Sequence, residues 1–220
     1  MKLYYAPASS YSQRVLVALY EKNTEFTPIV VNLGDSSERA RYRALAPFGK
    51  VPLLDTDRGL IPEASIIIQY LDLIHPGSKL VPDDALLALE VRLIERIVDV
   101  YLNGGRQAVF DEAQRAPEQR RPDTIAKGRS FIELGCRALE ARLLARQWLG
   151  GDSFSLADCA AAATFAQLGL LFRWQRFARL HEYTTRLADR PSVARVRRET
   201  ADATDRMLAT LPYSLPKEDL

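Results

Sequence analysis

Histidine and cysteine are scarce in this chain of 220 residues, which has two of each. The cysteines, Cys136 and Cys159, form no C-x-x-C motif, so a dithiol redox site is absent and we expect two reduced, packed thiols. No cluster of cysteine and histidine has the spacing of a zinc site, which predicts a protein without a bound metal. With His75 and His181 as the only histidines, a Ser-His-Asp hydrolase has little to draw on.

Long apolar runs and an excess of charge are missing as well. No stretch approaches the roughly 20 apolar residues that cross a bilayer, which argues against a membrane partner. The first residues show neither the apolar segment nor the cleavage pattern of a signal peptide, so we expect a cytoplasmic protein. The net charge is +2, and no strong basic field selects nucleic acid as a partner.

The first third of the chain mixes strand and helix patterns. Runs with β-branched residues predict strands, and apolar residues at helical spacing predict helices. These elements come in the order strand, helix, strand, irregular charged stretch, two strands of a hairpin, and helix, over residues 2–5, 12–22, 27–33, 34–43, 51–55, 60–61 and 64–74. The last helix ends near Pro76, because proline cannot continue it. A β-α-β unit followed by β-β-α predicts a four-stranded mixed sheet with helices.

Beyond Pro82 the strand patterns vanish and long amphipathic helices begin. A polar loop is expected over 116–123, and helices are expected over 84–102, 124–146, 156–172 and 179–211, the last divided near Pro191. The helix over 156–172 is apolar nearly all round, which predicts a central buried helix.

Two apolar rows run along the helix over 84–102. Together they form a wide stripe, which predicts a helix packed on other helices. The rows are Leu86, Leu89, Leu93, Ile97 and Val100, and Leu87, Val91, Ile94, Val98 and Tyr101. The change of pattern near Pro82 predicts an N-terminal domain over 1–78, a linker over 79–86 and a helical domain over 87–220.

Serines gather where the first strand turns into the first helix, at Ser9, Ser10 and Ser12. A helix N-terminus carries about half a positive charge and stabilises an anion. A hydroxyl beside it can donate to a thiolate, so this turn can promote ionisation of a thiol that belongs to a bound molecule. The alternative is that these serines only cap the helix.

Two further positions suit a ligand. A cis bond at Pro52 turns the main chain of Val51 outward, where its N–H and C=O can pair with an extended peptide. The alternative is a trans proline at a strand edge. Glu63 stands before the helix over 64–74, whose N-terminus suits a carboxylate while the acid itself suits an ammonium group. The alternative for Glu63 is a surface acid that favours the helix dipole.

Ser155 and Asp158 open the central helix with a spacing of three residues. This spacing predicts a capping box, with aspartate where glutamate or glutamine is usual. We assign it a structural role, because a buried helix end without hydrogen-bond partners is costly.

In their order and spacing these motifs resemble the cytosolic glutathione S-transferase family across essentially the whole chain, and its serine-type phi and zeta classes most closely. The matching stretches are PASSYSQRVLVALYEK, APFGKVPLL, PEASIIIQYL, FSLAD and DRPSV. The resemblance implies an α/β thioredoxin-like N-terminal domain plus an all-α C-terminal domain, the glutathione S-transferase architecture. It also implies a homodimer, with glutathione as the bound thiol and cosubstrate.

The resemblance implies roles for individual residues near the thiol. Ser9 takes the place of the serine that activates the thiol, with Ser10 as the alternative. The main chain of Val51, before a cis Pro52, pairs with the cysteine of glutathione. Lys50 stands where it can attract the glycyl carboxylate.

Glu63 matches the acid near the γ-glutamyl group, but the next position departs from the family. The family usually has a serine there, whereas this chain has Ala64, with a hydroxyl one place later on Ser65. Successive residues of a helix point about 100° apart, so Ser65 is no direct substitute. The backbone N–H groups of Ala64 and Ser65 are then expected to hold the carboxylate, with glutathione affinity lower by about ten- to a hundredfold.

The activity that the resemblance implies is a transferase, in which the glutathione thiolate attacks an electrophilic carbon of a small apolar molecule. Two other hypotheses share the fold. One is a noncatalytic interaction protein of the stringent starvation protein A type, which binds RNA polymerase, and the other is a glutathione-dependent isomerase similar to maleylacetoacetate isomerase. The electrophile site is expected between the domains, facing Ser9, with possible walls from Tyr11, Tyr101, Arg106, Phe110 and Trp174.

Overall fold

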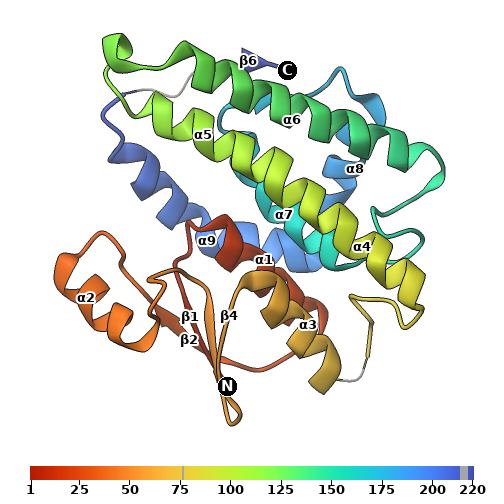
Figure 1. The fold of residues 1–220 in the computed structure, drawn as a ribbon. Helices are drawn as coiled ribbons and strands as arrows, with labels where there is room; N and C mark the ends of the chain where they lie inside the picture. Colours follow the sequence, from red (N-terminus) through yellow and green to blue (C-terminus); the bar gives the residue numbers. More distant parts are fainter. Residues whose placement is uncertain (76, 214–217) are drawn as a thin grey trace.

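The computed structural model describes residues 1–75, 77–213 and 218–220, so Pro76, predicted to end a helix, lies outside the described residues. The N-terminal part is a four-stranded sheet in the order β2-β1-β3-β4 (Figure 1). Its strands are β1 Lys2–Tyr5, β2 Thr27–Val30, β3 Leu53–Thr56 and β4 Gly59–Pro62. β1 runs parallel to β2 and antiparallel to β3, and β3 and β4 form the predicted hairpin. The predicted mixed sheet is confirmed.

Three helices accompany the sheet: α1 Ser10–Glu21, α2 Ser36–Leu45 and α3 Ala64–Ile74. α1 and α3 agree with the prediction, but the irregular stretch predicted over 34–43 is wrong, because α2 occupies most of it. Asp35 caps α2 by accepting from the Glu38 N–H at 2.7 Å, and Tyr42 is the buried residue of this helix. A helix that buries one side chain has no apolar row, so periodicity could not reveal it.

The helical part follows in the order α4 Ala85–Ile97, π-helix η1 Val98–Asn103, α5 Gly104–Ala113, α6 Pro122–Arg142, α7 Leu156–Leu168, α8 Ala178–Asp189 and α9 Pro191–Ala209. α4, η1 and α5 follow one another without a break, so the helix predicted over 84–102 extends further than expected. Two short 3-10 helices are also present, η2 Pro117–Gln119 and η3 Leu143–Ala145. A short parallel strand pair, β5 Phe172–Arg173 and β6 Glu218–Asp219, completes the fold. Within the described ranges, no helix is both long and apolar enough to span a membrane.

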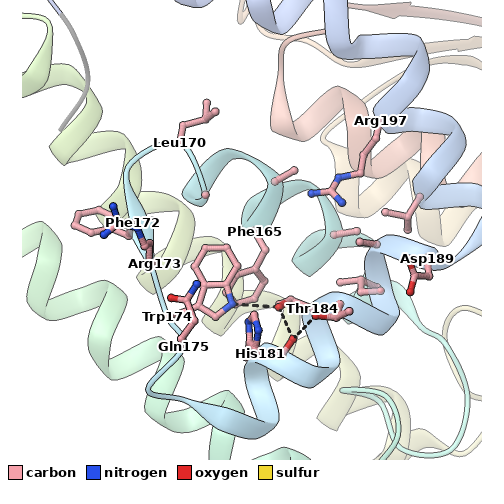
Figure 2. A pocket seen from close by; sticks show the side chains of 17 residues that line it. Phe165, Leu170, Phe172, Arg173, Trp174, Gln175, His181, Thr184, Asp189 and Arg197 are labelled. Carbon is pink, nitrogen blue, oxygen red and sulfur yellow. Dashed lines mark hydrogen bonds between the residues drawn. The ribbon is translucent and has the colours of Figure 1, made fainter. Parts of the chain in front are cut away.

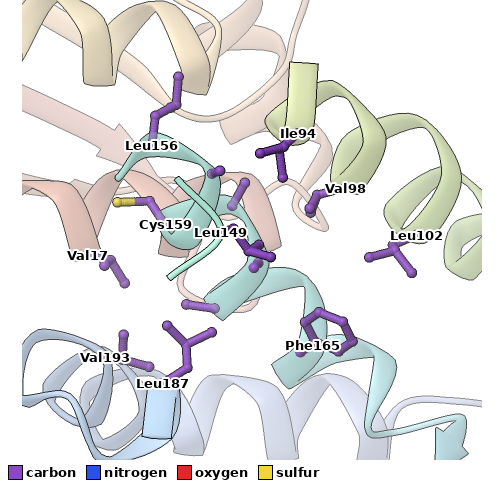
Figure 3. Packing of buried hydrophobic residues seen from close by; sticks show 14 of the residues in the cluster. Val17, Ile94, Val98, Leu102, Leu149, Leu156, Cys159, Phe165, Leu187 and Val193 are labelled. Atoms are coloured by element: carbon purple, nitrogen blue, oxygen red, sulfur yellow. The ribbon is translucent and has the colours of Figure 1, made fainter. Parts of the chain in front are cut away.

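α7 forms the centre of the helical core (Figure 3). Every residue of α7 except Ala166 is buried, which confirms the predicted central helix, although it ends at Leu168. Cys159 on α7 and Cys136 on α6 are buried free thiols, as predicted. α1 packs on both α7 and α9, so the helical part supports the helix that follows the serine turn (Figure 1).

Leu86, Leu89 and Leu93, which we call the outer row of α4, are exposed. This corrects the prediction that the whole apolar stripe packs on other helices of the chain. In the second row Val91, Ile94 and Val98 are buried, as expected, but Leu87 is 48% exposed and Tyr101 is 38% exposed. In the neighbouring row, Leu89 is 62% exposed and Leu93 is 59% exposed. One chain therefore buries the middle of one predicted row and leaves most of the apolar stripe open.

Asp72 fixes the segment between α3 and α4. Its carboxylate accepts from the N–H groups of Leu80 and Val81 at 3.0 Å each. It also pairs with Lys22 Nζ at 2.8 Å, and Lys22 donates to the Ser78 carbonyl at 3.1 Å. Burial opposes ionisation of Asp72, but these donors outweigh it and lower the pKa of the carboxyl. The connecting segment is thereby tied to the ends of α1 and α3.

Replacing Asp72 with asparagine is expected to lower the free energy of unfolding by about 2–4 kcal/mol at neutral pH, because Lys22 loses its buried partner. A carboxyl with a lowered pKa stabilises the fold above its unfolded-state pKa of about 3.9, and that stabilisation is lost as the pH falls through the folded-state pKa. Urea unfolding at several pH values should therefore show a difference between the two proteins that narrows below about pH 4.

A matched control is Asp83→Asn, at the exposed ion pair with Lys79, where we expect a change of less than about 0.5 kcal/mol. A difference for Asp72→Asn that stayed constant through the acidic range would rule out ionised Asp72 as the source of the stability.

Candidate functional site

The register of the sheet brings three segments to one edge. Tyr4 of β1 lies opposite Leu53 of β3, which lies opposite Pro62 of β4. Neighbouring strands are about 4.8 Å apart, so the turn after β1, the residues before β3 and the residue after β4 lie side by side. α1 and α3 both begin at this edge, and each presents its positive end there.

Ser9 and Ser10 lie in different environments at the start of α1. Ser9 is the N-cap, and its Oγ accepts from the Ser12 N–H at 3.4 Å. Among the residues that the structure describes, the Ser9 hydroxyl has no acceptor for its own hydrogen. Ser10 is buried, and its Oγ donates to Asn103 Oδ1 at 3.5 Å. The Ser9 hydroxyl therefore caps α1 and still has a hydrogen to donate to a ligand, whereas the Ser10 hydroxyl already donates its hydrogen to Asn103.

The segment before β3 has the predicted cis bond, between Val51 and Pro52. Tyr42 of α2 anchors it by donating from its hydroxyl to the Lys50 carbonyl at 2.8 Å. No hydrogen bond joins the Val51 N–H or C=O to another of the described residues. The main chain of Val51 is thus available to a ligand, and the Lys50 side chain is exposed beside it.

Glu63 stands at the start of α3 in an unusual backbone conformation, with φ 71° and ψ 117°. Non-glycine residues with positive φ cost about 1–3 kcal/mol and concentrate at functional sites. Glu63 is exposed and makes no side-chain cap on α3, so the first N–H groups of the helix, from Ala64 onward, are left open. Both features suit a ligand with an ammonium group and a carboxylate.

The hydroxyl of Ser65 is already hydrogen-bonded within the protein. It donates to Glu95 Oε1 of α4 at 2.6 Å, and the same oxygen pairs with Arg14 Nη1 at 3.2 Å. Arg14 is fully buried and also pairs with Asp99 Oδ1 through Nη2 at 3.2 Å. Ser65 therefore belongs to an ion-pair network that joins the two domains, and its backbone N–H remains the group that can face the edge.

Asn103 and Arg106 approach this edge from the helical part. Asn103 ends the π-helix, and its Oδ1 accepts from Ser10 Oγ and also from Arg106 Nε at 3.1 Å. Sequence patterns did not identify Asn103, because a π-helix has no periodic signal of its own. Of the expected walls, Arg106 lies close to Tyr11, while Tyr101 packs on Phe131 of α6.

A separate groove of about 470 Å³ opens between α7, α8 and α9 (Figure 2). Trp174, expected as a wall of the electrophile site, lines this groove, packs on Phe165 and donates from Nε1 to Thr184 Oγ1 at 3.1 Å. His181 also lines it (Figure 2). The lining residues all fall within 162–197, so the groove is built without the three segments of the sheet edge.

The fold and the sheet edge together define a class of protein: a thioredoxin-like domain with a cis proline before β3, joined to a domain that is helical except for the short strand pair β5–β6. Comparison with known proteins makes the assignment specific. Residues 3–79 match the family of the glutathione S-transferase N-terminal domain, and residues 123–198 match that of the C-terminal domain. The chain belongs to the glutathione S-transferase family.

Individual relatives agree with this assignment. Glutathione S-transferase F13 of Arabidopsis thaliana is 32% identical over 165 residues, which are 72% of this chain and 75% of that protein. Maleylacetoacetate isomerase of Pseudomonas aeruginosa is 32% identical over 171 residues, 72% of this chain and 76% of that one. A crystal structure of a glutathione S-transferase from Methylobacillus flagellatus with glutathione bound has a TM-score of 0.81 at 26% identity, and the match covers 89% of this chain and 98% of that chain.

Proposed function

We propose that this protein is a glutathione transferase. The thiolate of bound glutathione attacks an electrophilic carbon of a small molecule, a carbon–sulfur bond forms, and the displaced group leaves with the bonding electrons. The observation that carries this proposal is the open hydroxyl of Ser9 at the positive end of α1, at the same sheet edge as Val51 and Glu63. A donor and a helix end that converge on one place lower the pKa of a thiol there.

The rest of the edge supports binding of an extended tripeptide. The open N–H and C=O of Val51 suit the main chain of the cysteinyl residue, as in pairing with an added strand. Exposed Glu63 suits the γ-glutamyl ammonium, and the open N–H groups of Ala64 and Ser65 suit its carboxylate. Lys50 suits the glycyl carboxylate at the other end.

A glutathione-dependent isomerase is the second candidate, supported by the similarity to maleylacetoacetate isomerase. In that reaction the thiolate adds to a double bond and is later expelled, so glutathione is regenerated. Product analysis separates the two activities: a transferase consumes one glutathione per product, whereas an isomerase converts a cis enone with no net loss of thiol.

Calorimetric titration with glutathione tests the binding site, and Glu63→Gln is the informative variant. We expect glutathione binding to the unaltered protein and an affinity about tenfold lower for Glu63→Gln, because a charged hydrogen bond is lost. Glu25→Gln, at another exposed glutamate, should leave the affinity unchanged. No heat at millimolar glutathione would favour the noncatalytic interaction protein.

We propose, further, that a second copy of the chain covers the outer row of α4. Leu86, Leu89 and Leu93 are 78%, 62% and 59% exposed, and such contiguous apolar surface marks an interaction site. Leu93→Glu is expected to weaken self-association about 100-fold, because a carboxylate would be buried without a partner. Sedimentation velocity over a concentration series measures this effect. Leu144→Glu, at another exposed leucine, is the control, and an equal loss there would count against the α4 face.

A further inference from the structure

Arg106 of α5 is a buried arginine without an acidic partner. Arg106 is only 6% exposed. Its guanidinium donates to two side-chain amide oxygens, from Nε to Asn103 Oδ1 at 3.1 Å and from Nη2 to Gln107 Oε1 at 2.8 Å. No carboxylate of the described residues forms an ion pair with it. The other deeply buried arginine, Arg14, is neutralised by two acids.

The position of Arg106 ties it to the start of α1. Asn103 Oδ1 accepts from both Arg106 Nε and Ser10 Oγ, so the guanidinium lies within one side chain of the serine next to Ser9. Burial lowers the pKa of Arg106, while Tyr11 and Asp111 oppose that shift. Arginine stays charged in proteins, so the fold holds near the start of α1 a buried positive charge that forms no ion pair with the described residues.

A buried charge without a partner is costly, and a bound anion removes that cost. The guanidinium fork matches a planar carboxylate, and a single net charge suits a monoanion. We propose that Arg106 selects electrophiles that carry a carboxylate near the reactive carbon. This inference rests on the proposed function, because it needs glutathione sulfur at the start of α1.

A matched pair of substrates tests the proposal: 4-chloro-3,5-dinitrobenzoate and its methyl ester. In both, the thiolate attacks the carbon that bears chlorine, chloride leaves with the bonding electrons, and the thiol proton passes to solvent. Each catalysed rate is divided by the uncatalysed rate with glutathione, which removes the difference in intrinsic reactivity. We expect the normalised kcat/KM to be about tenfold or more higher for the acid than for the ester.

Variants of Arg106 then locate the source of this preference. Arg106→Gln should lower kcat/KM for the acid about 10- to 100-fold, mainly through KM, and change the ester by less than about threefold. Arg106→Lys should keep part of the preference, because the charge remains without the fork. Arg137→Gln, at an exposed arginine of α6, should change neither substrate. Thermal midpoints and glutathione affinity of each variant show that the fold and the first site are intact.

The outcomes separate the two proposals. The role of Arg106 would be overturned if Arg106→Gln changed kcat/KM equally for the acid and the ester, or if the unaltered enzyme did not prefer the acid. Turnover of the ester would in either case still support the transferase. Absence of glutathione binding and of turnover with both substrates would overturn both proposals.

Discussion

Replacing Ser9 with alanine is expected to lower kcat/KM for glutathione conjugation about 100-fold, because the glutathione thiolate loses one preorganised hydrogen-bond donor. The Ser9 hydroxyl accepts from the Ser12 N–H, which leaves its own hydrogen free for the sulfur. Ser10→Ala is expected to cost much less, because the Ser10 hydroxyl is buried and donates to Asn103. Steady-state kinetics with a chlorinated nitroaromatic measures both effects.

The pH profile distinguishes activation of the thiol from mere positioning. A hydrogen bond to the charged form lowers a pKa, so loss of the Ser9 donor should raise the pKa of the bound thiol. The rising limb of the rate profile should move upward by roughly one to two pH units for Ser9→Ala. At a pH well above that limb the rates of the two proteins should converge.

Ser9 also caps α1, so the variant needs a control for lost stability. Removal of an N-cap costs about 1 kcal/mol. Asp84→Ala removes a comparable cap from α4, where the carboxylate accepts from the N–H groups of Leu86 and Leu87, far along the chain from the turn. Equal slowing by Asp84→Ala, or full activity of both serine variants, would remove the serine from the mechanism.

Much of the sheet edge followed from local sequence. The helix over 64–74 was predictable because its apolar spacing and the position of Glu63 agree, and the structure places α3 over the same residues. The two strands before it, β3 and β4, are short but are bounded by turn residues. The cis bond at Pro52 is confirmed, and the main-chain groups of Val51 are open as expected.

What the sequence did not reveal depends on partners distant in the chain. Tyr42 is the one fully buried residue of α2, and Leu45 packs only partly against the core, so the helix lacks a periodic apolar row. The Ser65 hydroxyl bonds to Glu95, which is thirty positions away, and no spacing rule connects them. Asn103 reaches Ser10 from a π-helix, a local change of pitch that tertiary packing determines.

Replacing Asp158 with alanine is expected to lower the free energy of unfolding by about 4 kcal/mol. The predicted capping box is confirmed: the fully buried carboxylate accepts from Ser155 N–H at 2.9 Å and Ser155 Oγ at 2.7 Å. It also accepts from Leu149 N–H at 2.9 Å and Tyr183 Oη at 2.7 Å. Alanine leaves these donors buried without an acceptor, and each costs about 1–3 kcal/mol.

For a chain of this size, a loss of about 4 kcal/mol corresponds to a fall in Tm of roughly 8–16 °C. Urea and thermal unfolding measure it, with Asp152→Ala as the control, since that nearby aspartate is exposed and should matter by less than about 0.5 kcal/mol. A loss below about 1 kcal/mol for Asp158→Ala would show that the helix start does not depend on its carboxylate. α7 also carries Gln167, whose Nε2 donates to the Ala8 carbonyl at 3.3 Å, directly before Ser9. Gln167 lies near the end of α7 and Asp158 at its start, so this contact should persist in Asp158→Ala as long as the helix is folded. Glutathione affinity of Asp158→Ala should then match that of the unaltered protein well below its lowered Tm, and activity should disappear together with the fold.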